Sequence, residues 1–350
     1  MPIIGIIASS KKTAANADLA IAHDVSPFVT AYSFSSAAGY GAKYANPAVL
    51  PADTGHAVDF STGNTTIGVG GYQYISSYAW TLGVGFGSRI SNTSVASFYF
   101  DAMSIAPNNA FMALSTYGSN KGVHGYLYST TTGLGMKFAN PSVLPSPNEE
   151  MYGVAVNNAS TDGAFVGYSP PGILAYPMST SGFGTKYANP TPTQDNCGGV
   201  DFHPTDASIF LTTRYNDYAT AYAWTNGSGF GAKYANASPA VTNWATPGEF
   251  SPSGNAVAFG LQASYSPYIE AYAWSNSTGW GTKYSAPSTI PSGQTMNLRF
   301  KPTGDVVSAA MNTGAYTISY AWSDSSGFGA KYSNPATPPA GYPLAVSYSR

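Results

Sequence analysis

The chain has 350 residues, 14% of them aromatic and 9% charged, and its 14 basic and 16 acidic residues give a net charge of −2. This balance lacks the basic excess typical of nucleic-acid-binding proteins. The sequence also contains no run of about 18 apolar residues, the length needed to span a membrane. With Cys197 as the single cysteine, an intrachain disulfide is excluded.

The first segment, residues 1–13, has no counterpart later in the chain. It carries Ile3, Ile4, Ile6 and Ile7. The run is too short for a signal peptide, and its lysines follow the apolar residues instead of preceding them. Exposed isoleucines would be a liability in water, so something should cover them. We therefore expect an N-terminal arm that docks on a partner subunit, as an added strand on its sheet edge. The alternative is an extended arm packed on the neighbouring part of this chain.

From residue 14 to residue 350 one pattern recurs seven times. Each copy has a tyrosine as its anchor: Tyr32, Tyr78, Tyr126, Tyr176, Tyr222, Tyr272 and Tyr320. A bulky residue stands two positions later: Phe34, Trp80, Tyr128, Met178, Trp224, Trp274 and Trp322. A Gly-x-Gly and then a basic residue follow: Lys43, Arg89, Lys137, Lys186, Lys233, Lys283 and Lys331. The basic residues are 46 to 50 positions apart, and such a period of short strands is typical of a β-propeller with one blade per repeat.

Each copy predicts four strands. In the sixth copy these are the Phe-x-Pro strand beginning at Glu249, a small apolar strand from Ala256 to Gly260, the strand that holds Tyr272 and Trp274, and a last strand from Gly279 to Tyr284. Alternation along the third strand puts its tyrosine and tryptophan on one face. Proline, which has no N–H for a sheet ladder, follows the last strand in several copies.

The two ends of the repeat region complement each other. The first copy starts at Asp18 without its Phe-x-Pro strand, and a matching segment stands at the other end, Leu344 to Tyr348. We therefore predict an all-β, seven-bladed β-propeller of four-stranded blades, closed by the C-terminal strand joining the N-terminal blade. Such closure removes free strand edges. The second copy, with Arg89-Ile90, and the fourth, with Pro177 and Met178, predict irregular blades.

No pattern of catalytic or metal-binding residues recurs in the repeats. The Gly-x-Gly segments lack the following helix of a nucleotide site, so they favour close approach of a neighbouring aromatic residue. The histidines His23, His56, His124 and His203 have no partners at metal-ligand spacing. The pair Glu149-Glu150 fits a solvated loop, and Asp59, Asp201 and Glu249 share a loosely acidic position. We therefore expect no catalytic residue, no cofactor and no metal.

Two sets of residues could form a binding surface. The seven basic residues of the repeat could form a ring facing an anionic surface, although lysine stems commonly just cover aromatic side chains. The aromatic residues that do not recur are Tyr72, Tyr74, Tyr99, Tyr117, Tyr168, Tyr215, Tyr218 and Trp244. Loops rich in aromatic and amide groups suit stacking on sugars, although ordinary packing also accounts for such residues.

Two resemblances extend this interpretation. The run from Phe250 to Phe259, with Ala271 to Ser275 after it, resembles the repeat of WD40-like propellers, which implies the fold and no ligand. The opening Gly5 to Ser10 and the Gly-Phe-Gly-x-Lys-Tyr-x-Asn-Pro repeat are similar to segments of tailed-bacteriophage virion proteins.

The phage resemblance implies a non-enzymatic structural component of a capsid or tail, used for assembly, decoration or host contact. It would be made in the host cytoplasm and located in the virion. Its partners would be other virion proteins, bound through the arm, with a host surface glycan as a further candidate and no nucleic acid. The alternative is a glycan- or receptor-binding, lectin-like propeller that gains avidity from one weak site per blade, and an enzyme is the third hypothesis.

Overall fold

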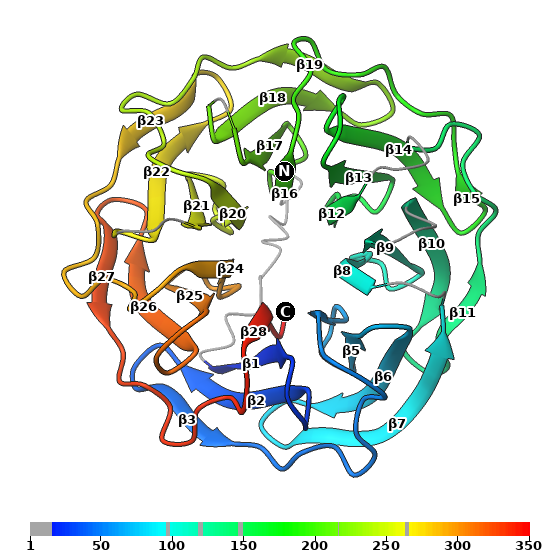
Figure 1. Cartoon of the computed structure of the whole chain (residues 1–350), viewed down its shortest axis with the longest axis vertical. Helices are drawn as coiled ribbons and strands as arrows, with labels where there is room; N and C mark the ends of the chain where they lie inside the picture. The colour runs from blue at the N-terminus through cyan, green and yellow to red at the C-terminus, as the bar shows by residue number, and fades with distance from the viewer. Residues whose placement is uncertain (1–15, 96–98, 118–121, 146–149, 216, 263–265) are drawn as a thin grey trace, which may run out of the picture.

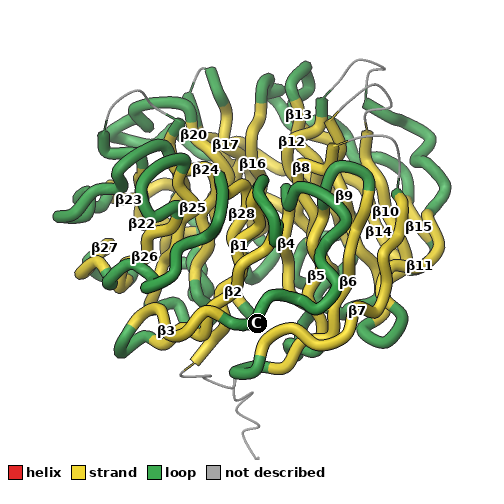
Figure 2. The backbone as a smooth tube through the Cα atoms, turned by 60° about the horizontal axis from the view of Figure 1, so that its bottom comes forward, coloured by secondary structure: helices red, strands yellow, loops and turns green. Residues whose placement is uncertain are grey.

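The computed structural model describes residues 16–95, 99–117, 122–145, 150–215, 217–262 and 266–350. Seven four-stranded antiparallel sheets surround a central channel like the blades of a propeller (Figure 1). The described ranges contain only strands and loops (Figure 2), so none of them includes a helix that could cross a membrane. The predicted fold class is confirmed. The predicted arm, including Ile3, Ile4, Ile6 and Ile7, lies outside the described residues, so its docking role stays a prediction.

Every blade runs from an innermost strand at the channel to an outermost strand at the rim. The innermost strands are β28 (Pro343–Tyr348), β4 (Ala57–Phe60), β8 (Tyr99–Ile105), β12 (Met151–Val156), β16 (Cys197–Phe202), β20 (Ala245–Phe250) and β24 (Thr295–Phe300). The second strands are β1 (Asn16–His23), β5 (Thr66–Gly70), β9 (Phe111–Tyr117), β13 (Asp162–Gly167), β17 (Ser208–Thr213), β21 (Ala256–Leu261) and β25 (Val306–Met311).

The third strands carry the anchor tyrosines, and six of the outermost strands carry the Gly-x-Gly and the basic residue, which in the fourth blade extend beyond the short β15. The third strands are β2 (Val29–Ser35), β6 (Tyr74–Thr81), β10 (Gly122–Ser129), β14 (Ile173–Ser179), β18 (Ala219–Thr225), β22 (Ile269–Ser275) and β26 (Thr317–Ser323). The outermost strands are β3 (Gly39–Lys43), β7 (Gly85–Ser94), β11 (Gly133–Lys137), β15 (Gly182–Phe183), β19 (Gly229–Lys233), β23 (Gly279–Lys283) and β27 (Gly327–Lys331).

The first blade has the strand order β28-β1-β2-β3, so it is built from both ends of the chain. β28 pairs antiparallel with β1, where Tyr348 faces Leu19 and Val346 faces Ile21. In Figure 1 the red C-terminal strand lies beside the blue first strand. The predicted closure of the ring by Leu344 to Tyr348 is therefore confirmed.

The anchor tyrosines are conserved between blades for a physical reason. All seven rings are buried, and each hydroxyl donates a hydrogen bond to a backbone carbonyl in the loop that enters its own blade from the preceding one. In the sixth blade, for example, the Tyr272 hydroxyl lies 3.0 Å from the Pro239 carbonyl oxygen. A buried hydroxyl needs such a partner, and the same loop supplies it in every blade.

In six of the seven copies the first glycine of the Gly-x-Gly leaves room for a side chain of the preceding blade, and Gly182 of the fourth blade is the exception. A Cβ atom on Gly229 would lie 2.8 Å from the ring of Tyr187, and one on Gly327 would lie 2.7 Å from the side chain of Tyr284. Both tyrosines belong to the outer strand segment of the preceding blade. The expected close approach of an aromatic residue is confirmed. In the second blade Ile90 replaces this tyrosine, and a Cβ on Gly133 of the third blade would meet Ser91 instead.

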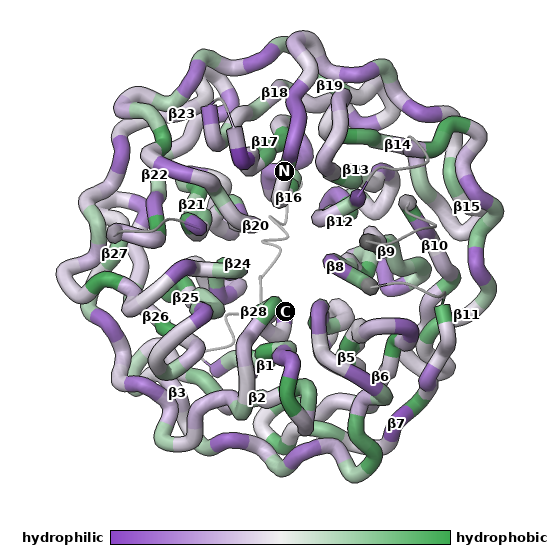
Figure 3. The backbone as a smooth tube through the Cα atoms, in the orientation of Figure 1, coloured by the Kyte–Doolittle hydropathy of each residue, from purple (hydrophilic) through white to green (hydrophobic). Residues whose placement is uncertain are grey.

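The hydrophobic core lies between the blades. The Trp274 ring makes edge-to-face contacts with Tyr234, Phe250 and Trp280, at centroid distances of 5.0, 5.2 and 5.4 Å. Trp224 and Trp322 repeat this arrangement in their own blades. Hydrophilic residues recur around the outer rim (purple in Figure 3). Because each blade packs only against its two neighbours, this packing repeats around the ring. The residues that line the channel are not part of it and can differ from blade to blade.

Two blades are irregular, as predicted. The outermost strand of the second blade is extended to the ten residues of β7, whereas β15 in the fourth blade has only two. Pro177 in β14 has no N–H to give to β15, which explains the short pairing.

Candidate active site

The central channel narrows to a cavity of about 60 Å³ lined by residues from all seven innermost strands. Most of the lining is small or aliphatic. Its polar side chains include Asp101 of β8, Tyr152 of β12, and Asn297 and Arg299 of β24. We call the end of the channel at which the innermost strands begin the channel mouth. The cavity has room for water and is much smaller than typical ligand pockets, so a substrate would have to enter from the mouth.

Asp101 and Tyr152 point away from the regular ladder because each lies at a β-bulge. The register of β8 against β9 shifts between Phe100 and Ala102, and that of β12 against β13 shifts between Met151 and Gly153. A bulge re-aims one side chain and is common next to active sites. Four other innermost strands shift register near the same level, but with glycine or uncharged residues there.

His56 takes the corresponding place in the second blade. It stands four residues before the end of β4, as Asp101 does in β8 and Tyr152 in β12. Of these three residues, Asp101 and Tyr152 line the channel cavity, and His56 stands directly before β4. Burial lowers the pKa of His56, against the opposing charges of Asp53 and Asp24, so the imidazole is neutral at pH 7.

Asp101 has the electrostatics of a general base. Burial and, to a smaller extent, the nearby charge of Glu150 raise the pKa of its carboxyl to about 7, against the opposing charge of Arg214. Within the described part of the chain, no hydrogen bond to this carboxyl is found. A half-buried carboxyl that titrates near neutral pH can both accept and return a proton under physiological conditions.

Tyr152 joins two further charged residues to this position. Its hydroxyl donates a hydrogen bond of 2.6 Å to the Glu150 carboxylate. The Arg214 guanidinium lies over the Tyr152 ring, 5.1 Å from its centre, which is a cation–π contact. We refer to Asp101, Glu150, Tyr152 and Arg214 as the mouth cluster. It brings a titratable acid, a hydroxyl and a fixed positive charge to one side of the channel.

A second level of polar residues lies three positions further along the same strands. Here the side chain of one blade accepts a hydrogen bond from a backbone N–H of the next blade. Asp59 accepts from Ile105, Ser104 from Val156, Asp201 from Phe250 and Glu249 from Phe300, over 2.6 to 3.2 Å. We call Asp59, Ser104, Asp201 and Glu249 the inter-blade acceptors. Their oxygens stabilise the ring.

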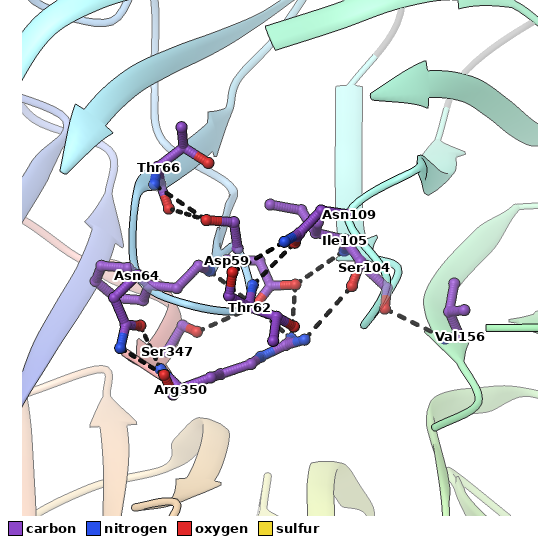
Figure 4. A network of polar contacts seen from close by, with 12 residues as sticks. Asp59, Thr62, Asn64, Thr66, Ser104, Ile105, Asn109, Val156, Ser347 and Arg350 are labelled. Atoms are coloured by element: carbon purple, nitrogen blue, oxygen red, sulfur yellow. Dashed lines mark hydrogen bonds and ion pairs between the residues drawn. The ribbon is translucent and has the colours of Figure 1, made fainter. Parts of the chain in front are cut away.

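The C-terminal residue reinforces this level. The Nη2 atom of Arg350 lies 2.7 and 2.8 Å from the two carboxylate oxygens of Asp59, and Ser347 also donates to Asp59 (Figure 4). The backbone N–H of Arg350 donates to the Asn64 side chain. The closing strand is therefore tied to the second blade by an ion pair and hydrogen bonds.

Asp201 and Glu249 are neighbouring buried carboxyls at this level. Burial raises the pKa of Asp201, and the Glu249 charge raises it further, while Arg299 and two backbone N–H groups oppose the shift. Burial likewise raises the pKa of Glu249 against the charge of Arg299. Each carboxyl is held by a backbone N–H, so this pair is structural in geometry even though its pKa values are perturbed.

The remaining histidines have structural surroundings. His23 bonds to Thr30, His124 to Thr116, and His203 to Thr205 and the Gly254 carbonyl. Across the described ranges no three histidine, cysteine or acidic residues gather to hold a metal ion.

Six of the seven basic residues of the repeat lie on the outermost strands, and Lys186 follows the short β15. In four blades the lysine ammonium donates to the asparagine three residues later: Lys43 to Asn46, Lys186 to Asn189, Lys233 to Asn236 and Lys331 to Asn334. In the sixth blade alanine stands at this asparagine position, and Lys283 instead pairs with buried Glu270 over 2.6 Å. These contacts explain why lysine and Asn-Pro recur together.

Sequence reasoning missed the mouth cluster. Asp101 and Arg214 do not recur in the repeat, and the sequence suggests a solvated loop for Glu150, whose carboxylate accepts a hydrogen bond from Tyr152. One signal was present: aligning the copies on the end of the Phe-x-Pro strand brings His56, Asp101 and Tyr152 to one position. Among the unrepeated aromatic residues, Tyr168, Tyr215 and Trp244 lie beside the cluster, and the side chains of Tyr99 and Tyr117 lie outside the described residues.

No protein-family model matches the sequence. No curated protein matches it either. Among solved structures, a proposed 6-phosphogluconolactonase from Bacteroides uniformis is 13% identical, with a TM-score of 0.74 over 95% of this chain and 99% of that one. A periplasmic gluconolactonase from Pseudomonas aeruginosa has the same identity and TM-score over 96% and 99%. The β-propeller domain of Swd1 from Myceliophteria thermophila is 10% identical, with a TM-score of 0.57 over 81% and 87%.

The likeness is one of fold. It supports the WD40-like, seven-bladed propeller and gives no indication of a phage origin. The hypothesis of a non-enzymatic virion component or lectin-like propeller is contradicted, because three of the neighbours that cover nearly the whole chain bear the names of lactone-hydrolysing enzymes. The prediction that the chain is not an enzyme is wrong on the same ground. The physical reason is that the residues of the mouth cluster do not repeat from blade to blade, so the repeat pattern does not reveal them.

Proposed function

We propose that this protein is a hydrolase that opens a small sugar lactone at the channel mouth. The observation that carries the proposal is Asp101, an aspartate that a β-bulge directs into the channel cavity beside Tyr152 and Arg214. The fold likeness to proteins named gluconolactonase and 6-phosphogluconolactonase supports the choice of substrate class.

The reaction needs three contributions from the chain. Asp101, in its ionised form, takes a proton from water as the water oxygen attacks the lactone carbonyl carbon. The Arg214 guanidinium stabilises the negative charge that develops on the carbonyl oxygen, as oxyanion-binding groups do. The ring C–O bond then breaks, and protonated Asp101 returns its proton to the leaving alkoxide. Lactone and water thus give one hydroxy acid, and the enzyme is unchanged.

The pKa of Asp101 fits both halves of this cycle. A pKa of about 7 leaves comparable populations of base and acid at neutral pH. Because the attacking step needs the ionised form, kcat/KM should rise with pH through about 7 and then level off. Spontaneous lactone opening also accelerates with pH, so the profile applies to the enzymatic rate after that background is subtracted.

The direct test is a pH-stat assay of the purified protein with δ-gluconolactone and 6-phosphogluconolactone. Saturable acceleration of acid release above the spontaneous rate, with the pH profile above, is the expected result. The Asp101→Asn protein, purified in the same way, reports any contaminating lactonase. If the wild-type protein accelerates neither substrate, or if the variant is as active, the proposal fails.

A further inference from the structure

Three aromatic side chains surround one side of the channel mouth without taking part in the repeat. They are Tyr168 after β13, Tyr215 after β17 and Trp244 before β20, so they come from three consecutive blades. Tyr168 and Tyr215 are 49% and 48% exposed, unlike the seven buried anchor tyrosines. We refer to these three residues as the aromatic platform. Large exposed aromatic surface next to a reactive cluster is typical of a binding surface.

The platform is connected to the mouth cluster by backbone hydrogen bonds. The N–H of Tyr168 donates to the Glu150 carbonyl over 2.9 Å, and the Tyr168 carbonyl accepts from Asn196 over 2.7 Å. Arg214 in turn donates to the Asn196 carbonyl over 2.9 Å. Tyr215 directly follows Arg214 in the chain, so the proposed oxyanion-stabilising residue and the platform share one loop.

The aromatic residues are also held in place. The Tyr215 and Trp244 rings meet edge to face, 6.1 Å apart at 77°. The Tyr215 carbonyl accepts a hydrogen bond of 2.7 Å from the Thr213 hydroxyl, and the Trp244 carbonyl accepts one of 2.9 Å from Gln262. Rings that are fixed before binding lose little conformational entropy on contact with a ligand.

The size of the channel says which part of a substrate lies here. The cavity that reaches Asp101 measures about 60 Å³, well below the 300 Å³ or more of typical ligand pockets. Only the reacting water and the carbonyl end can occupy it, so the rest of the substrate must lie over the mouth, where the platform stands. Tyrosine and tryptophan offer an apolar face and a polar edge, which matches a pyranose ring with its C–H faces and peripheral hydroxyls.

Building on the proposed lactonase function, we infer that the aromatic platform binds a second pyranose unit, so the preferred substrates are lactones of disaccharide aldonic acids. Contacts with a part of the substrate that does not react can still lower the barrier to reaction, because that binding energy helps to orient the reacting end. The wild-type protein should therefore hydrolyse the lactone of cellobionic acid with a higher kcat/KM than δ-gluconolactone.

The test compares these two substrates in Tyr215→Ala, Trp244→Ala and the control Leu144→Ala, an exposed apolar residue outside the platform. Each platform change should lower kcat/KM for the disaccharide lactone about tenfold and leave the monosaccharide lactone and the control unaffected. Equal turnover of both substrates by the wild-type protein would overturn the inference while leaving the lactonase proposal intact. An aryl-substituted lactone preferred as strongly as the disaccharide would overturn the assignment to pyranose.

A binding measurement separates this inference from the proposed function. Titration with cellobiose, followed by tryptophan fluorescence, should give a saturable change that disappears in Trp244→Phe. If no lactone is hydrolysed and this change is present, the platform stands and the lactonase proposal falls. If cellobiose causes no change, or the change persists in Trp244→Phe, the platform does not bind pyranose.

Discussion

Two levels of the same seven strands carry acidic residues and use them differently. At the level of the inter-blade acceptors, Asp59, Asp201 and Glu249 each hold a backbone N–H of the next blade. Asp101 lines the cavity at a level that lies three positions closer to the channel mouth along the strand. No hydrogen bond to its carboxyl is found in the described part of the chain. The same side-chain chemistry thus serves ring closure at one level and is available for proton transfer at the other.

The comparison teaches that a perturbed pKa alone does not identify a catalytic group. Asp201 and Asp101 both have a raised pKa, with burial as the largest cause. They differ in what their oxygens contact, since Asp201 accepts from the Phe250 N–H, whereas Asp101 lines the cavity and no hydrogen bond to its carboxyl is found among the described residues. Changes at the acceptor level should therefore alter stability, and changes at the mouth should alter activity.

The largest effect should follow deletion of residues 344–350. The deletion removes most of β28, exposes the edge of β1, and removes both Arg350 and Ser347 from Asp59. An open ring exposes pairing groups that promote aggregation. We expect loss of the cooperative thermal transition by circular dichroism and aggregation in size-exclusion chromatography. A truncated protein that keeps its melting temperature would show that β28 is dispensable for closure.

The next effect concerns the mouth level. Asp101→Asn keeps the shape of the side chain and removes the proton acceptor, so the lactonase kcat should fall about 100-fold or more. The melting temperature should not decrease, because no hydrogen bond to this carboxyl is lost. Asp201→Asn is the matched control, since its carbonyl oxygen can still accept from Phe250, and it should keep activity within about threefold. Equal losses of kcat in Asp101→Asn and Asp201→Asn would contradict the distinction between a catalytic level and a structural level.

The sequence predicts the propeller ring because the residues that stabilise it recur from blade to blade. The anchor tyrosines make the same contact in all seven blades, a glycine admits a neighbouring tyrosine in five, and the lysine–asparagine pair occurs in four. The mouth cluster, by contrast, occurs once in the ring and is not part of the repeat. Its residues meet only because β8, β12 and the loop after β17 come from three consecutive blades around one channel, and the bulges that direct Asp101 and Tyr152 have no local sequence signature.

A smaller effect is expected from Asp59→Ala at the acceptor level. This change leaves the Ile105 N–H without its carboxylate and removes the partner of Arg350. We expect a loss of about 2–3 kcal/mol in unfolding free energy by urea titration, mostly from the hydrogen bonds to the charged group. Arg350 is partly exposed, so the ion pair itself adds little, and Arg350→Ala should cost less than about 1 kcal/mol. A larger loss in Arg350→Ala than in Asp59→Ala would reverse this ranking.

The smallest effect is on the pH dependence of stability. Asp201 and Glu249 have folded-state pKa values above those of the unfolded chain, so the folded protein keeps protons that the unfolded chain releases above about pH 4. Their contribution favours folding below that pH and is lost as pH rises through the folded-state values. Buried His56 and His124, with lowered pKa values, act in the opposite direction, but only below about pH 6.5.

The window above pH 6.5 therefore isolates the acidic residues. Asp201→Asn resembles the protonated carboxyl, so it should be more stable than the wild-type protein at pH 8.5, by on the order of 1 kcal/mol, and this advantage should shrink at pH 6.5. Urea midpoints at the two pH values measure the difference. Asp59→Asn is the opposing control, because it removes the charge that pairs with Arg350 and should destabilise at both pH values. If Asp201→Asn is less stable than the wild-type protein at pH 8.5, the Asp201 carboxylate is stabilising in its charged form, and Arg299 rather than burial governs this pair.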